Sequence, residues 1–138
     1  LRVAGSFHLG RRSVVLAAGH GTVWLSFDRR TRSGRSALVA IDERSGRLRF
    51  RRALRGDPWG LAAGRAAVWA LMGQDGWSRL VMVDARRGTR SWAAGGPASP
   101  GGISAAAGLV WVSSLCGGPR CDISLAGVRA YRARDGRP

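Results

Sequence analysis

The chain has 138 residues, of which 45% are hydrophobic, and this is enough material for one domain with a modest core. Its formal net charge is +15, and all 23 basic residues are arginine. No run approaches the roughly 18 consecutive apolar residues of a membrane-spanning helix, so the composition excludes such a span.

The high positive charge has a simple genomic explanation. The sequence contains neither Lys nor Asn, and Arg, Ala and Gly have GC-rich codons, which points to a GC-rich genome. The arginines are also spread along the whole chain. We therefore expect a solvated basic surface and no nucleic-acid site, with polyanion binding through the Arg-rich surface as an alternative.

The predicted elements begin with residues 1–7, which align with the fourth strand of a later repeat but have no repeat of their own. Three repeats follow at about 13–52, 58–93 and 100–136. A period of about 40–45 residues built from short strands is typical of β-propeller blades. We therefore expect an all-β domain over 1–138 with three four-stranded antiparallel blades, in which 1–7 completes the last blade or a neighbouring one.

Each repeat is interpreted as four strands in the same order. The first strand is rich in Gly and Ala, as a crowded axis requires, and the fourth is rich in Arg, as an exposed edge requires. The third strand ends at a glycine turn, where Asp42 and Asp84 are predicted to cap the backbone. The second strand carries a recurring tryptophan, which is predicted to pack between blades in all three copies: Trp24, Trp69 and Trp111.

Three blades are fewer than the roughly four to eight of closed propellers. Three explanations stay open: the chain is a fragment of a longer propeller, two copies together close one ring, or the blades form an open fan. The chain begins at Leu1 and not at Met, which favours a piece of a longer protein, so the remaining blades are expected partners.

Two cysteines, Cys116 and Cys121, flank a Gly-Gly-Pro-Arg segment. This segment predicts a turn that brings the two sulfur atoms together, so we expect a disulfide and an oxidising compartment outside the cytosol. The alternative is half of a metal site, for which only His8 and His20 are available as further soft ligands.

Three segments resemble the repeats of YVTN-type and virginiamycin B lyase-like bacterial propellers: Ala66–Trp69, Leu80–Gly88 and Gly56–Ala62. The resemblance implies four-stranded antiparallel blades in a secreted or surface-attached bacterial protein. The lyase members hold a divalent metal with acidic residues beside a catalytic His. That set has no match here, because both histidines lie outside any matching motif and Glu43 is the only Glu.

The direction of the strands predicts where a binding site lies. The connections that enter each first strand share one face with those that join second and third strands, and binding residues concentrate on such connections. A mixture of Arg, Trp and Asp there suits a protein or a small anionic or sugar-like ligand. The candidate ligand-binding residues are Asp57, Trp59, Asp75, Trp77, Arg29 and Arg30.

We therefore predict a non-enzymatic binding or scaffolding module of an extracytoplasmic bacterial protein. No phosphate loop, zinc signature or nucleophile elbow is present, and we assign no catalytic residue, metal ligand or cofactor. The alternative is an enzyme of the lyase or lactonase type whose metal site lies in blades missing from this chain.

Overall fold

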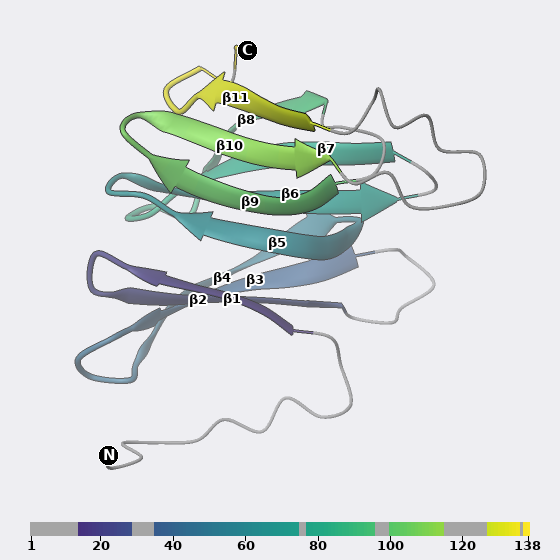
Figure 1. Cartoon of the computed structure of the whole chain (residues 1–138). Coiled ribbons are helices and arrows are strands. Elements are labelled where there is room, and N and C mark those ends of the chain that lie inside the picture. Colours follow the sequence, from purple (N-terminus) through teal and green to yellow (C-terminus); the bar gives the residue numbers. More distant parts are fainter. Residues whose placement is uncertain (1–13, 29–34, 75–76, 96–99, 115–126, 136) are drawn as a thin grey trace, which may run out of the picture.

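The protein is all-β in the part of the chain that its computed structural model describes. The strands form three antiparallel sheets that follow one another along the sequence, and each strand pairs with its neighbour in sequence within its sheet (Figure 1). No helix occurs among these residues, so none of them forms an apolar helix that could cross a membrane. The described residues are 14–28, 35–74, 77–95, 100–114, 127–135 and 137–138.

The first sheet runs in the order β1-β2-β3-β4. Apolar and β-branched residues dominate the inner strands, whereas arginines alternate with apolar residues on the fourth, so the pattern matches a sheet whose last strand is exposed. Its strands are β1 (Val14–Gly19), β2 (Thr22–Asp28), β3 (Arg35–Asp42) and β4 (Leu48–Arg55).

The second sheet repeats this topology, and the third does so over its three described strands. In the second sheet the strands are β5 (Asp57–Ala63), β6 (Ala67–Gln74), β7 (Trp77–Asp84) and β8 (Arg90–Gly95). In the third they are β9 (Pro100–Ala106), β10 (Leu109–Ser114) and β11 (Gly127–Arg132). The strands lie where the repeats predict them, while the predicted strand at 1–7 lies outside the described residues.

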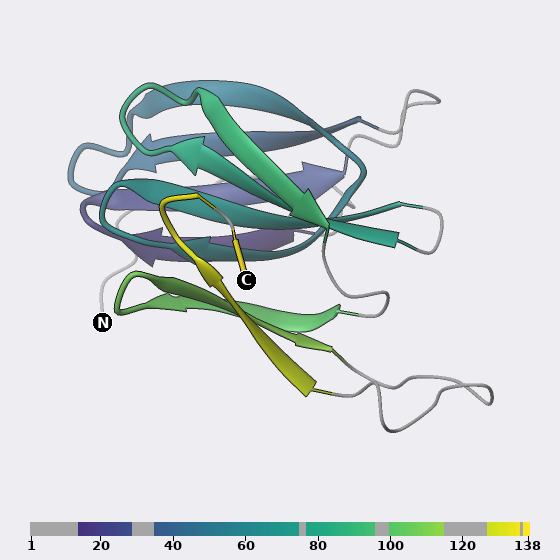
Figure 2. The same ribbon diagram turned by 90° about the horizontal axis from the view of Figure 1, so that it is seen from above.

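The three sheets stack face to face, with the first strands β1, β5 and β9 as neighbours. Figures 1 and 2 show this stack from two directions. Two apolar layers hold it together, one between the first and second sheets and one between the second and third. The described sheets form a stack and do not close into a ring.

The recurring tryptophans differ in burial, which corrects the prediction that all three pack between sheets. Trp24 is 1% exposed and faces the second sheet, and Trp69 is 5% exposed and faces the third. Trp111 is 41% exposed, because no further sheet in the described structure covers its face. The same sequence position is therefore core in two repeats and surface in one.

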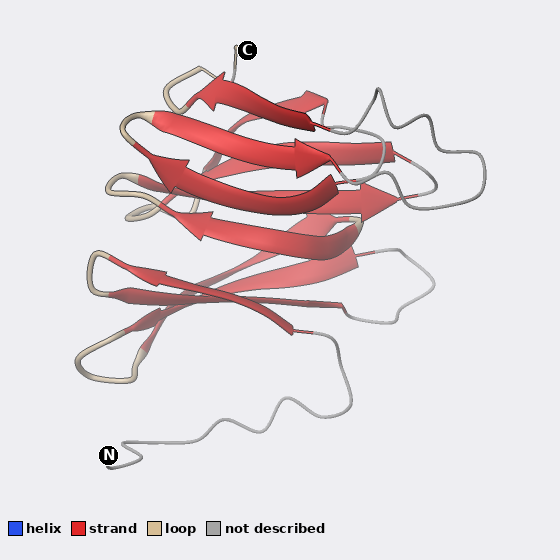
Figure 3. Cartoon of the chain, viewed as in Figure 1, coloured by secondary structure: helices blue, strands red, loops and turns tan. Residues whose placement is uncertain are grey.

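The up-and-down strand order separates the connections into two ends. One end, the turn end, holds the short turns, and it gathers most of the tan segments in Figure 3. The opposite end, the loop end, holds the last residues of β2, β4, β6, β8 and β10 and the first residues of the strands that follow. This is the distribution that chain direction predicts.

Candidate functional site

Three of the six predicted site residues come together at the loop end. Asp57 begins β5 and pairs with Gly73 near the end of β6, and Trp59 follows on the same strand. The backbone of Trp77 begins β7 and pairs with Gln74. The other three predicted residues, Asp75, Arg29 and Arg30, lie outside the described part of the chain.

The strands around Trp59 fix the position of its side chain. The register of β5 against β6 shifts between Pro58 and Gly60, so Trp59 sits at an irregularity that redirects its side chain. Its indole covers Gly73 so closely that a Cβ at this glycine would collide with Cε2 and Cζ2 of the ring. The side chain nevertheless stays 43% exposed. One face of the ring is thus held by bare backbone while part of the indole is open to solvent.

Sequence reasoning missed Gly73, although it is what allows the indole to lie flat. A glycine inside the apolar strand 67–74 was the available signal, because strand glycines often mark a close approach. Exposed Asp57 adds a carboxylate two residues before Trp59. The loop end therefore presents the partly exposed indole of Trp59, packed on Gly73, beside the carboxylate of Asp57 as a hydrogen-bond acceptor.

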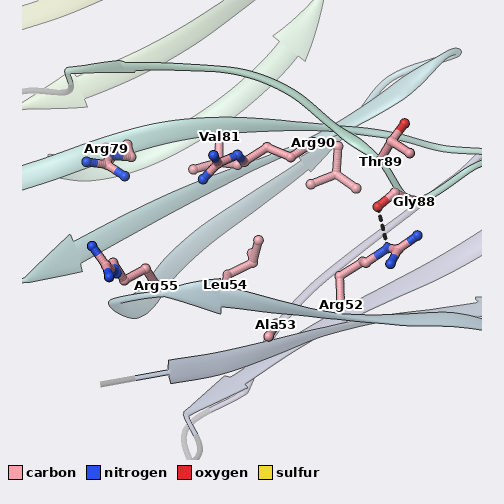
Figure 4. A pocket seen from close by; sticks show the side chains of 10 residues that line it. Arg52, Ala53, Leu54, Arg55, Arg79, Val81, Gly88, Thr89 and Arg90 are labelled. Carbon is pink, nitrogen blue, oxygen red and sulfur yellow. Dashed lines mark hydrogen bonds between the residues drawn. The ribbon is translucent and has the colours of Figure 1, made fainter. Parts of the chain in front are cut away.

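A second feature, which sequence reasoning did not identify, is a groove between the outer strand of the first sheet and the second sheet (Figure 4). Its volume is about 740 Å³. We call it the arginine groove, because four of its lining residues are arginines and none of the described lining residues is acidic. It is lined by Arg52, Ala53, Leu54, Arg55, Arg79, Val81, Val83, Gly88, Thr89 and Arg90.

Hydrogen bonds fix one wall of the arginine groove. Arg52 Nε donates to the carbonyl of Gly88 at 2.7 Å, and Nη2 donates to the carbonyl of Arg87 at 3.3 Å. These bonds join β4 to the β7–β8 turn, so they hold the two sheets in register across the groove. A guanidinium bonded to carbonyls keeps its full charge, so Arg52 still contributes a positive field.

The nearest carboxylate on β7 belongs to its own turn. Asp84 Oδ1 accepts hydrogen bonds from the backbone N–H of Arg86 at 2.9 Å and of Arg87 at 2.6 Å. The bond from Arg87 is the main reason why the pKa of Asp84 lies below its ordinary value. This confirms the predicted capping role, and it directs the charge of Asp84 to the turn and away from the groove.

A smaller hollow of about 540 Å³ lies at the turn end between the second and third sheets. Alanines and Trp69 make up half of its lining residues. Trp69 Nε1 is buried without a hydrogen-bond partner among the described residues. His20, exposed in the β1–β2 turn with φ of 53°, lies at the edge of this hollow.

The metal and disulfide hypotheses gain no site within the described structure. No three His, Cys, Asp or Glu side chains gather there into a group that could hold a metal ion. Cys116, Cys121 and His8 lie outside the described residues. The disulfide therefore stays a prediction.

Comparison with known proteins adds no assignment. No protein-family model matches the chain, and no curated protein matches it. The resemblance to YVTN-type and virginiamycin B lyase-like repeats stays a prediction from the quoted phrases. The evidence for a function is therefore the geometry of the loop end and of the arginine groove.

Proposed function

We propose that this chain is a segment of a β-propeller and acts as a non-enzymatic binding module. Three consecutive antiparallel sheets with the same internal order support the propeller architecture, as do their adjacent first strands. In such an arrangement the sheets form a rigid frame and the connections at one end carry recognition.

The observation that carries the binding function is the seating of Trp59 on Gly73 beside Asp57. An indole ring that is already fixed against the backbone loses little conformational entropy when a ligand binds. The favourable free energy of its contact with the ligand is therefore not reduced by the cost of immobilising the side chain. Its exposed apolar surface suits the C–H face of a sugar ring, and the carboxylate of Asp57 accepts hydrogen bonds from hydroxyl groups. The proposed ligand at the loop end is therefore a sugar-like molecule, because the negative charge of Asp57 disfavours an anion.

The test is retention of the protein on an array of neutral and acidic oligosaccharides. We expect neutral glycans to retain the native chain, and Trp59→Leu to weaken that retention at least tenfold. Trp111→Leu is the matched control, because this residue has a similar exposure but lies on a sheet face away from the loop end. Asp57→Asn separates the role of the carboxylate from that of the ring.

Two results would contradict the proposal. One is the absence of any glycan that retains the native chain, and the other is equal loss of retention in the Trp59 and Trp111 variants. Thermal unfolding of both variants provides the check on folding.

The proposed location is outside the bacterial cytosol, and it rests on the cysteine pair. A disulfide between Cys116 and Cys121 requires an oxidising compartment. Thiol titration of the unreduced, denatured protein isolated from its source checks this, with no free thiol as the expected result. Two free thiols per chain would exclude the disulfide.

A further inference from the structure

We propose that the arginine groove binds a linear phosphate chain, as in inorganic polyphosphate. The groove lies along β4 and β7–β8, and its binding function does not depend on the sugar site proposed at the loop end. Its residues come from two repeats, so the site exists only when the first and second sheets are stacked.

The charge of the groove favours an anion. Four arginines line one open cavity with no acidic side chain among its described lining residues, so the cavity carries a positive electrostatic field. Two nearby carboxylates are engaged elsewhere: Asp84 caps its own turn, and Asp42 pairs with Arg49. This field attracts an anion into the groove.

Several guanidinium N–H donors in the groove are available to hydrogen-bond a ligand. The side chains of Arg55 and Arg90 make no hydrogen bond or ion pair within the described structure, and both residues are exposed. Arg52 uses two of its three nitrogen atoms on carbonyls. The planar fork of arginine matches the oxygen spacing of phosphate, and this gives bidentate contacts that a lysine cannot make.

The length of the groove points to a chain of phosphates. Arg52 and Arg55 are three residues apart on an extended strand, which separates their backbones by about 10 Å. On the opposite wall, Arg90 pairs with Val83, four residues along β7 from Arg79. Figure 4 shows Arg55 and Arg79 at one end of the groove and Arg52 beside Gly88 at the other. A linear chain can place one phosphate at each end, and the bonds of Arg52 to two carbonyls keep its guanidinium at its own end of the groove.

The lining also argues against single-stranded nucleic acid. Proteins bind such strands by stacking bases on aromatic side chains, and no described residue of the groove is aromatic. A phosphate chain has no bases and needs none of these contacts.

The experiment is calorimetric titration of the full chain with tripolyphosphate at low and at physiological salt. The groove variant is Arg55→Gln with Arg90→Gln. The matched control is Arg44→Gln with Arg129→Gln, which removes the same charge from exposed arginines outside the groove. We expect one site per chain, binding at least tenfold weaker in the groove variant, and binding within about twofold of native in the control.

Further probes distinguish the ligand. Orthophosphate is expected to bind at least tenfold more weakly than tripolyphosphate, and saturating tripolyphosphate should raise the Tm of the native chain and not of the groove variant. A second variant, Arg55→Lys with Arg90→Lys, keeps the charge but removes the forks and should bind with intermediate affinity.

Four outcomes would overturn the proposal. They are the absence of saturable binding, an equal loss of affinity in the groove and control variants, equal binding of orthophosphate, and tighter binding of a single-stranded DNA oligomer than of tripolyphosphate. The second outcome would assign the affinity to diffuse surface charge.

Discussion

At the scale of single residues, Asp42 shows how a turn and a sheet are linked by one carboxylate. Its Oδ1 accepts hydrogen bonds from N and Oγ of Ser45, both at 2.8 Å, and its Oδ2 pairs with the guanidinium of Arg49. Arg49 in turn donates to Oγ1 of Thr22 at 2.8 Å, which joins β2 to β4. The hydrogen bond from Arg49, followed by those from Ser45, holds the pKa of Asp42 well below its ordinary value.

This lowered pKa predicts how stability depends on pH. Because the folded state favours the carboxylate, its contribution is fully present above 3.8, the unperturbed pKa, and is lost as the pH falls through the lower folded-state value. We expect Asp42→Asn to lower the Tm at pH 7, and the difference from the native chain to shrink steadily below pH 3.8. Thermal unfolding followed by circular dichroism between pH 7 and pH 2 measures this. A difference that does not change with pH would contradict it.

The recurring tryptophans give a second prediction at this scale. Removing a fully buried Trp leaves a cavity, so Trp24→Ala should reduce the free energy of unfolding by about 3–5 kcal/mol. Trp111 has the same place in its repeat but is largely exposed, so Trp111→Ala should cost only about 1 kcal/mol. Urea unfolding of both variants provides the values. Equal losses would mean that Trp111 is covered in solution by something that packs on its face.

At the scale of elements, two equivalent turns have different surroundings. Gly46 and Gly88 both have positive φ, 67° and 65°, and both N–H groups donate to the carbonyl of the aspartate that begins the turn. A Cβ on Gly46 would meet nothing within 4 Å, whereas a Cβ on Gly88 would lie 2.7 Å from Cδ2 of Phe50. Phe50 belongs to β4, so the second turn is pressed against the neighbouring sheet.

The two glycines therefore form a matched pair of variants. Gly46→Ala should cost about 1–2 kcal/mol from the left-handed backbone alone. Gly88→Ala should cost about 1–3 kcal/mol more, since it also forces apart Phe50 and the turn. Urea unfolding tests the order, and an equal loss in both variants would show that the contact between the turn and β4 is loose. Gly88→Ala should also weaken tripolyphosphate binding, because the Gly88 carbonyl positions Arg52.

At the scale of the whole molecule, the three sheets in the described part of the chain have two covered interfaces and two outer faces. Leu61 lies at an inner interface and is 8% exposed, whereas Leu16, its counterpart in the first repeat, is 62% exposed on one outer face. Trp111 is the corresponding exposed residue on the other outer face. These faces are repeats of surfaces that already pack on each other, so they are suited to stack a second copy head to tail.

We therefore expect the mass of the chain in solution, measured by light scattering, to rise with concentration above the 14.7 kDa of one chain. Leu16→Arg should suppress this association, because it places a charge on an apolar contact face. Trp59→Arg is the control, since it also removes an exposed apolar residue but lies at the loop end. A chain that stays monomeric at every concentration and binds no hydrophobic dye would show that the outer faces do not associate.

The sequence by itself determined the strands, their order and the turns. The signals are local: a recurring tryptophan segment, alternating apolar residues around it, and glycines at the turns. Neighbouring strands with these signals pair by backbone hydrogen bonds and form hairpins. The capping by Asp42 and Asp84 was predictable for the same reason, because each bonds within a few residues of itself. The placing of Asp57, Trp59 and Trp77 at one end followed from strand direction alone.

Only the tertiary structure decided what the repeats do to one another. Trp24 and Trp111 occupy equivalent positions in sequence, and their burial differs because burial depends on which sheet packs next. The seat of Trp59 on Gly73 depends on a shift in register, and the arginine groove joins side chains from two repeats. Packing between segments that are distant in sequence creates these features, so a local pattern of residues cannot predict them.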